Sequence, residues 1–294
     1  MTHVIEHTMD AVTSAINSPA LRYHGGKFRL AQWVMQFFPP HQRYTEAFGG
    51  AAGVLLQKPR AYAEIYNDLD DEIVNFFRVL RDPVQCAQLL QALHFTPYAR
   101  AEFDMSWTPA ADPVEQARRT AVRAAMGFGS AGATKGSTGF RIDSKRAHGT
   151  AQMLWTRYPE SVMAAAERMR GVLIEHRPAI EVLTQHDGLD ALHFVDPPYV
   201  LDTRNMRAST RCYRYEMSDD DHLQLLHTLR QLKGAVVLSG YPHALYDDTL
   251  HDWARHTTSA RISAGRGTGL RTECVWLNPQ CARALAGKTG GLFA

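Results

Sequence analysis

The chain has 294 residues, of which 45% are hydrophobic and 21% are charged, and its formal net charge is +2. This is enough apolar material for one large domain or two modest ones, and so small a net charge says nothing about partners. The four cysteines are scattered, with no C-x-x-C pair, and no apolar run reaches membrane-spanning length. A structural metal site and a membrane span are therefore not expected. The N-terminal segment lacks the apolar core of a signal peptide, so we expect a soluble cytoplasmic protein.

The first predicted elements alternate between strand and helix. Residues 44–48 (YTEAF) are typical of a strand that runs into the glycine turn GGAAG. Residues 62–66 (YAEIY) predict a second strand, which ends before Asn67 and Asp68. Apolar residues in 71–81 recur near a 3.6-residue period, which predicts a helix with one buried face.

The alternation then stops for about 80 residues and resumes at residue 172. Within the interruption, residues 85–95 and 113–126 have helical patterns, and 127–150 is a glycine-rich and basic loop. After it we predict strands at 172–175, 192–195, 235–239 and 273–277. Ser218, followed by three aspartates, predicts a helix start. This order predicts an α/β domain with a doubly wound sheet and a helical insertion.

The sequence HFVDPPYV at 193–200 is unusual at the end of a buried strand. Neither proline can donate to a strand ladder, so pairing must stop there and Asp196 must lie at the carboxyl end of the strand. Ligands of open α/β sheets bind at that edge. The glycine turn with Gly49, Gly50 and Gly53 meets the same edge, and Asp68 follows about twenty residues later. Small residues under a ligand and a carboxylate for ribose hydroxyls indicate nucleoside binding, although such a turn can also serve only to reverse the chain.

Three segments in this order resemble the Dam-like, D12 class of amino-methylating DNA methyltransferases. They are YHGGKFRL (23–30), YTEAFGGAAGVLL with YNDLDDE (44–72), and VDPPY (195–199). The resemblance implies a Rossmann-like methyltransferase sheet that binds S-adenosylmethionine and carries an inserted target-recognition domain. The implied division is a flexible arm (1–20), a catalytic domain (21–85 and 166–280), an inserted DNA-recognition domain (86–165) and a frayed tail (281–294).

The resemblance also implies a role for each matching residue. Tyr23 packs against the cofactor, Lys27 reaches its methionine end or the active-site acid, and Asp68 holds the ribose hydroxyls. Phe48 and Gly50 line the cofactor pocket, which Asp196 also borders. Two positions depart from the family pattern, with Ala47 in place of a proline and Ala52 in place of a later glycine of the turn, so a slightly tighter pocket is expected.

The DPPY tetrad suits methyl transfer to an exocyclic amine, whose lone pair is delocalised into the ring. The Asp196 carboxylate and the Pro197 carbonyl can accept the two amine hydrogens and favour a tetrahedral nitrogen. Tyr199 supplies a face on which an extruded base can stack. Positioning then does most of the work of the in-line transfer. A strand-ending turn with a core tyrosine is the simpler alternative.

DNA binding is expected from local charge, because basic residues gather in three segments. The first runs from Arg118 to Arg157, the second directly follows the tetrad, and the third is the predicted loop ARISAGRGTGLR. The residues that we predict to contact DNA are Arg141, Lys145, Arg204, Arg207, Arg211 and Arg214. A solvated basic face is the alternative.

The predicted function is site-specific N6 methylation of a flipped-out adenine in double-stranded DNA by a protein that is monomeric and metal-free. Aspartate at the first tetrad position favours adenine over cytosine N4, in line with the resemblance. An RNA adenine methyltransferase, a protein-amide methyltransferase and a non-catalytic DNA-binding or cofactor-sensing module are the other hypotheses. The family's recognition motif for GATC-type sites is missing from 124–140, so no target sequence is predicted.

Overall fold

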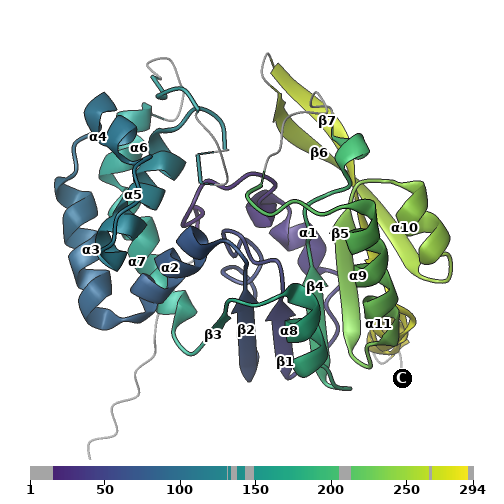
Figure 1. Cartoon of the computed structure of the whole chain (residues 1–294). Coiled ribbons are helices and arrows are strands. Elements are labelled where there is room, and N and C mark those ends of the chain that lie inside the picture. Colours follow the sequence, from purple (N-terminus) through teal and green to yellow (C-terminus); the bar gives the residue numbers. More distant parts are fainter. Residues whose placement is uncertain are drawn as a thin grey trace, which may run out of the picture.

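The computed structural model describes residues 16–130, 132–133, 138–142, 149–204, 213–264 and 267–290. Seven strands in these residues form one sheet in the order β3-β2-β1-β4-β5-β7-β6 (Figure 1). They are β1 (Arg43–Glu46), β2 (Ala63–Asn67), β3 (Leu173–Glu175), β4 (Ala191–Val195), β5 (Ala235–Gly240), β6 (Ala254–Ala264) and β7 (Gly267–Leu277). The first five are parallel, and β7 pairs antiparallel with both β5 and β6. The predicted α/β fold class, a Rossmann-like methyltransferase sheet, is confirmed.

Eleven α-helices accompany the sheet in the part of the chain that the structure describes. They are α1 (Ala31–Met35), α2 (Asp71–Arg81), α3 (Pro83–Phe95), α4 (Arg100–Met105), α5 (Pro113–Met126), α6 (Ala151–Thr156), α7 (Tyr158–Met169), α8 (Ala179–Gln185), α9 (Asp219–Gln231), α10 (Ala244–Thr249) and α11 (Pro279–Gly290). Helices α3 to α7 lie between α2 and β3 in the chain, where an insertion at 86–165 is predicted. Figure 1 shows α3 to α6 gathered on the side of the molecule opposite β6 and β7.

Side-chain caps explain where the helices of this region begin. Asp70, Asp82 and Asp112 each accept a hydrogen bond from a backbone N–H in the first turn of α2, α3 and α5. These bonds satisfy donors that a helix start leaves without a partner. Pro83 and Pro113 begin α3 and α5, where their missing N–H is harmless. Local sequence therefore marks the start of α2, α3 and α5.

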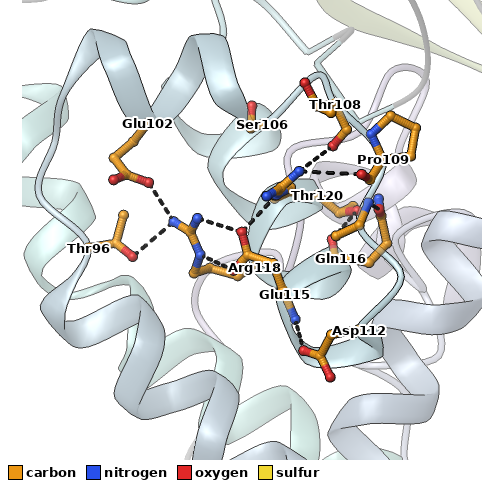
Figure 2. A network of polar contacts seen from close by, with 12 residues as sticks. Thr96, Glu102, Ser106, Thr108, Pro109, Asp112, Glu115, Gln116, Arg118 and Thr120 are labelled. Carbon is orange, nitrogen blue, oxygen red and sulfur yellow. Dashed lines mark hydrogen bonds and ion pairs between the residues drawn. The ribbon is translucent and has the colours of Figure 1, made fainter.

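An ion pair between Arg118 and Glu102 joins the helices α4 and α5 (Figure 2). The Arg118 guanidinium donates to Glu115 on its own helix, to Glu102 on α4 and to the hydroxyl of Thr96, with N–O distances of 2.7 to 3.2 Å. Arg119 also donates to Glu115, at 2.7 Å. Glu115 consequently has a lowered pKa, chiefly because Arg118 bonds to its charged form. These arginines of the first basic segment are thus engaged inside the helical region.

The carboxyl ends of β1, β2 and β4 lie at one edge of the sheet. β1 is central, with β2 on one side and β4 on the other, and their parallel registers bring Glu46 level with Tyr66 and with Phe194. The strand order changes direction between β1 and β4, and a switch point of this kind opens a crevice for ligands. The glycine turn after β1 and the tetrad after β4 therefore emerge side by side.

Three regions differ from the sequence expectation. The basic segment 260–271 was predicted as a loop, but most of it belongs to a β6–β7 hairpin in which Ala260 pairs with Arg271. The tail expected to fray from residue 281 is instead helix α11 as far as Gly290. The cause is Asn278, whose Oδ1 accepts from the N–H groups of Cys281 and Val236 and caps the helix onto β5.

Residues 16–20 of the expected flexible arm contact α7. The Ser18 hydroxyl lies 2.6 Å from that of Ser161, and the carbonyl of the buried Ala20 accepts from the Tyr158 hydroxyl. The remainder of the expected arm, 1–15, lies outside the described residues. The anchored body of the chain therefore includes residues that the sequence analysis assigned to the arm.

Candidate active site

A cavity of about 470 Å³ opens at the carboxyl edge of the sheet, at the switch between β1 and β4. Five short segments form most of its wall, namely residues 23–27, 46–51, 67–70, 178–181 and 213–217. Asp196 and Pro198 of the tetrad border it as well. The structure thus brings together every predicted cofactor residue, namely Tyr23, Lys27, Phe48, Gly50, Asp68 and Asp196.

Close packing explains the glycines of the turn after β1. A Cβ at Gly49 would collide with the ring of Tyr66, and one at Gly53 would lie 2.8 Å from the backbone nitrogen of Phe28. Gly50 has a φ of +47°, and its missing Cβ leaves room for the ring of Tyr23. Glycine adopts such left-handed conformations without steric cost. The turn thereby brings main chain close to the cavity.

Asp68 sits where the cavity meets the end of β2. Its Oδ2 accepts from the N–H of Gly50 at 2.7 Å, and its Oδ1 accepts from the N–H of Asp70 at 2.9 Å. Burial raises its pKa, while these backbone bonds lower it and only partly offset the rise. The backbone N–H of Leu69 also bonds to this carboxylate, which offers about four lone-pair positions in all. Asp68 is therefore a carboxylate that the main chain fixes at the edge of the cavity.

Lys27 and Asp196, which both line the cavity, form an ion pair that is largely buried. The Lys27 Nζ lies 3.0 Å from the Asp196 Oδ1, and their side chains are 5% and 15% exposed. Lys27 also donates to the carbonyl of Gly25 at 3.0 Å. Burial alone lowers the pKa of Lys27, but the carboxylates of Asp196 and Glu273 outweigh it and raise the pKa above its usual value. The lysine is therefore charged and orients the tetrad carboxylate.

Contacts to its hydroxyl and to its ring hold Tyr199 in place. The hydroxyl donates to the Glu273 Oε2 at 2.8 Å and lies 3.0 Å from the Ser239 hydroxyl. The ring contacts Tyr241 edge to face, with centroids 4.6 Å apart, and the Lys27 Nζ lies 4.7 Å from its centroid. Pro197 is buried, and neither Pro197 nor Tyr199 is among the residues that line the cavity, whereas Pro198 is. The tetrad backbone and ring are held rigidly from the β5 and β7 side.

Glu46 is a buried acid of this site that the sequence analysis missed. It is 3% exposed, borders the cavity, and its Oε2 accepts from the Tyr44 hydroxyl at 2.8 Å and the Leu55 N–H at 2.9 Å. Burial raises its pKa to about 8, with a further contribution from Asp196, so the carboxyl holds a proton at neutral pH. Glu46 is the last residue of β1, and Asp68 directly follows β2. This position at a strand end could have identified Glu46 from the sequence.

The segments 178–181 and 213–217 were also missed as parts of the cavity wall. The first follows β3 and leads into α8, so the same rule of strand ends could have found it. The segment 213–217 is merely rich in aromatic and charged residues. Its Tyr213 contacts Tyr23 and His24, which are distant in sequence. No local pattern indicates that contact.

The residues predicted to contact DNA occupy different settings. Arg141 is 6% exposed, and its backbone is bonded to Met126 and to the Tyr98 hydroxyl. Arg204 pairs with Glu216 at 2.8 Å. Arg214 is 39% exposed and pairs with Asp70 and Glu72 at 3.2 and 3.1 Å. Lys145, Arg207 and Arg211 lie outside the described residues. DNA contact stays a prediction for all six.

The described part of the chain holds neither a candidate metal centre nor a candidate membrane-spanning helix. No group of three or more His, Cys, Asp or Glu side chains there could hold a metal ion. Among the helices of the same residues, none is long and apolar enough to cross a membrane.

The sheet order and the cavity at its switch point are consistent with a Rossmann-like methyltransferase domain. Residues 23–107 match the sequence model of the D12 class N6 adenine-specific DNA methyltransferase family. This match confirms, for that part of the chain, the resemblance inferred from the motifs, and it supports DNA adenine methylation in the broad sense.

No curated protein matches the sequence. Among solved structures, the chain is similar to the precorrin 8W decarboxylase encoded by gene MT0146 of Methanobacterium thermoautotrophicum. The identity is 9% and the TM-score 0.35, over 85% of this chain and 88% of that one.

Proposed function

We propose that this protein transfers a methyl group from S-adenosylmethionine to N6 of an adenine in double-stranded DNA. The observation that carries the proposal is the shared cavity, in which Asp68 and the glycine turn face the Asp196–Lys27 pair. The part of the cavity proposed to bind the nucleoside thus adjoins the part proposed to bind the amine. Residues 23–107 of the same chain match an adenine methyltransferase family.

The residues of the cavity fit S-adenosylmethionine. Its volume lies within the range of roughly 300–1,000 Å³ usual for cofactor pockets. Asp68 would hold the ribose hydroxyls, and Tyr23, Phe48 and Gly50 would line the space around the nucleoside and methionine parts. Lys27 would reach the methionine end, where it already holds Asp196. When bound, the cofactor supplies the methyl group as an electrophile.

The chain's own contribution is to position the target amine. The Asp196 carboxylate and the Pro197 carbonyl accept its hydrogens, which frees the nitrogen lone pair. Lys27 lies 3.0 Å from one carboxylate oxygen, and this ion pair favours one orientation of the carboxylate beside the amine. Tyr199, held by Glu273 and Ser239, offers a rigid aromatic surface beside a flipped-out base. Rigid placement of this kind is the main source of rate in such a transfer.

The helical region would serve target recognition in this scheme. We assign residues 21–85 and 166–280 to the catalytic domain and 86–165 to the inserted recognition domain. Arg141, Lys145, Arg207 and Arg211 are the proposed contacts to DNA. Arg214, which is partly exposed, is a further candidate.

Replacement of Asp196 by alanine tests the proposal directly. We expect methyl transfer to plasmid DNA to fall by roughly 100-fold or more, because the amine loses its principal acceptor. Cofactor affinity should change little, since Tyr23, Lys27 and Asp68 provide most of its contacts. A tritiated-methyl assay and a methylation-sensitive restriction digest measure the first quantity, and calorimetric titration with S-adenosylmethionine measures the second.

Asp190→Ala is the matched control. Asp190 directly precedes β4, whereas Asp196 directly follows it, and the Asp190 side chain is half exposed. It should keep wild-type activity. Asp68→Ala should instead lose cofactor affinity strongly. Substantial methyl transfer by Asp196→Ala, or modification of RNA or of cytosine by the wild type, would overturn the assignment.

A further inference from the structure

Arg204 lies five residues after Tyr199, and its guanidinium is buried inside the chain. Its side chain is only 9% exposed. Nη1 donates to the Glu216 Oε2 at 2.8 Å, and Nη2 donates to the carbonyl oxygen of Tyr199, the last residue of the tetrad. One guanidinium thus joins the end of the tetrad to the segment 213–217.

Glu216 extends this connection to the cavity wall. Its second oxygen, Oε1, accepts from the backbone N–H of Tyr213 at 2.9 Å. The ring of Tyr213 lies beneath Arg204, with the guanidinium carbon 5.2 Å from the ring centroid. Arg204 therefore fixes Tyr213 from two directions, through its ring and through the carboxylate that binds its backbone.

Tyr213 in turn packs against the N-terminal loop of the site. Its hydroxyl donates to the carbonyl of His24 at 3.3 Å, and a side chain at Gly25 would collide with that hydroxyl. Two residues further on, Lys27 pairs with Asp196. The contacts form a closed ring that runs from the tetrad through Arg204, Glu216 and Tyr213 to the lysine loop and back to the tetrad.

We propose that Arg204 and Glu216 are a positioning pair that holds the 213–217 wall of the cofactor cavity in register with the DPPY tetrad. This inference rests on the proposed function, since it assigns the pair to the cofactor site. A buried guanidinium that is already bonded to a carboxylate and a carbonyl would lose both bonds if it turned to a phosphate. Arg204 accordingly serves the cofactor and the tetrad, and the DNA-contact role expected for it passes to other residues.

The test compares Arg204→Ala, Arg204→Lys and Glu216→Gln with the wild type. We expect each variant to weaken S-adenosylmethionine binding at least about tenfold, because each loses one charge-assisted hydrogen bond. Arg204→Lys should not rescue, because an ammonium lacks the planar fork that reaches both acceptors. In steady-state assays KM for the cofactor should rise while KM for DNA and the salt dependence of DNA affinity stay unchanged. Arg230→Ala, which breaks an exposed pair with Asp252, is the control and should alter none of these.

The outcomes separate the two proposals. If the wild type does not bind S-adenosylmethionine, the proposed function fails. If the wild type binds it and all three variants bind it equally well, the positioning role is wrong. A salt slope that falls by about one in Arg204→Ala shows a phosphate contact and also overturns the role. Glu216→Gln, which keeps the side-chain shape, carries the test if Arg204→Ala does not fold.

Discussion

Ala52 holds a backbone conformation that alanine rarely adopts. Its φ is +54°, in the left-handed region, at the turn position where the D12 resemblance has glycine. An L-residue with a Cβ costs about 1–2 kcal/mol there relative to its usual conformation. The departure noted in the sequence is thus a local strain in the turn that borders the cavity.

Replacement of Ala52 by glycine should therefore be better tolerated than replacement of its neighbour Ala51. Both residues are buried, and both variants lose a methyl group and gain unfolded-state entropy, but only Ala52 has a positive φ. We expect the free energy of unfolding to favour Ala52→Gly over Ala51→Gly by about 1–2 kcal/mol. Urea denaturation of the two variants measures this difference. Equal values would show that the turn carries no strain.

Glu46 should make the stability of the protein depend on pH. Burial raises its pKa to about 8 in the folded chain, far above that of an unfolded glutamic acid, so the folded state holds a proton that the unfolded state releases. Stability is then greatest below the unfolded pKa and falls as pH rises through about 8. The expected loss between pH 5 and 9 is on the order of a few kcal/mol.

Glu46→Gln tests this expectation, because glutamine mimics the protonated acid and can accept the same bonds from Tyr44 and Leu55. The free energy of unfolding, followed in urea at several pH values, should decline less steeply for the variant than for the wild type. Parallel curves would mean that another group causes the pH dependence.

At the scale of helices, Glu72 joins three elements. It lies in the first turn of α2 and forms an ion pair with Arg123 of α5, whose side chain is 5% exposed, and another with Arg214 beside the cavity. Arg123 also donates to the carbonyl of Ser106 at 2.7 Å. Burial lowers the pKa of Arg123, and Glu72 is the principal group that opposes this effect.

Loss of the Glu72 charge should therefore destabilise the helical region. We expect Glu72→Gln to lower the free energy of unfolding by about 2–4 kcal/mol, because it leaves a buried guanidinium without its counter-ion. Glu160→Gln is the control, since Glu160 forms an exposed pair with Arg157 and should change stability by less than about 0.5 kcal/mol. Chemical denaturation of both variants gives the comparison. An equally small loss of unfolding free energy in the two variants would show that Arg123 finds other partners.

Local signals explain which elements the sequence predicts well. Helices α2 and α5 match their predicted ranges because a cap and a 3.6-residue period mark both. The strand predicted at 273–277 is the second half of β7, but β6 and the first half of β7 were not predicted. Glycines and arginines in 260–271 suggest a loop, and only pairing along the whole of both strands makes them extended. Helix α11 was missed because its cap, Asn278, is fixed by a distant contact to β5.

In the site, too, local sequence reveals some residues and long-range contacts decide the role of others. Residues that follow strands, such as Asp68 and Asp196, could be found because the fold class alone brings strand ends to one edge. Arg118 and Arg204 were both expected on a DNA-facing surface, but each is engaged by acids that lie elsewhere in the chain. The basic count of a segment does not reveal those acids, since they approach only in the folded state.

At the scale of the whole molecule, the helical region also affects how the sheet assembles. β3 pairs with β2, although α2 to α7 separate the two strands by on the order of 100 residues in the chain. Pairs so distant in sequence form late during folding, whereas contacts within a helical segment form early. Helix α2 contacts both α7 and β3, so the helical region and this edge of the sheet share one packing element. Synthesis of the chain thus yields the helical region before it yields the strands that complete the sheet.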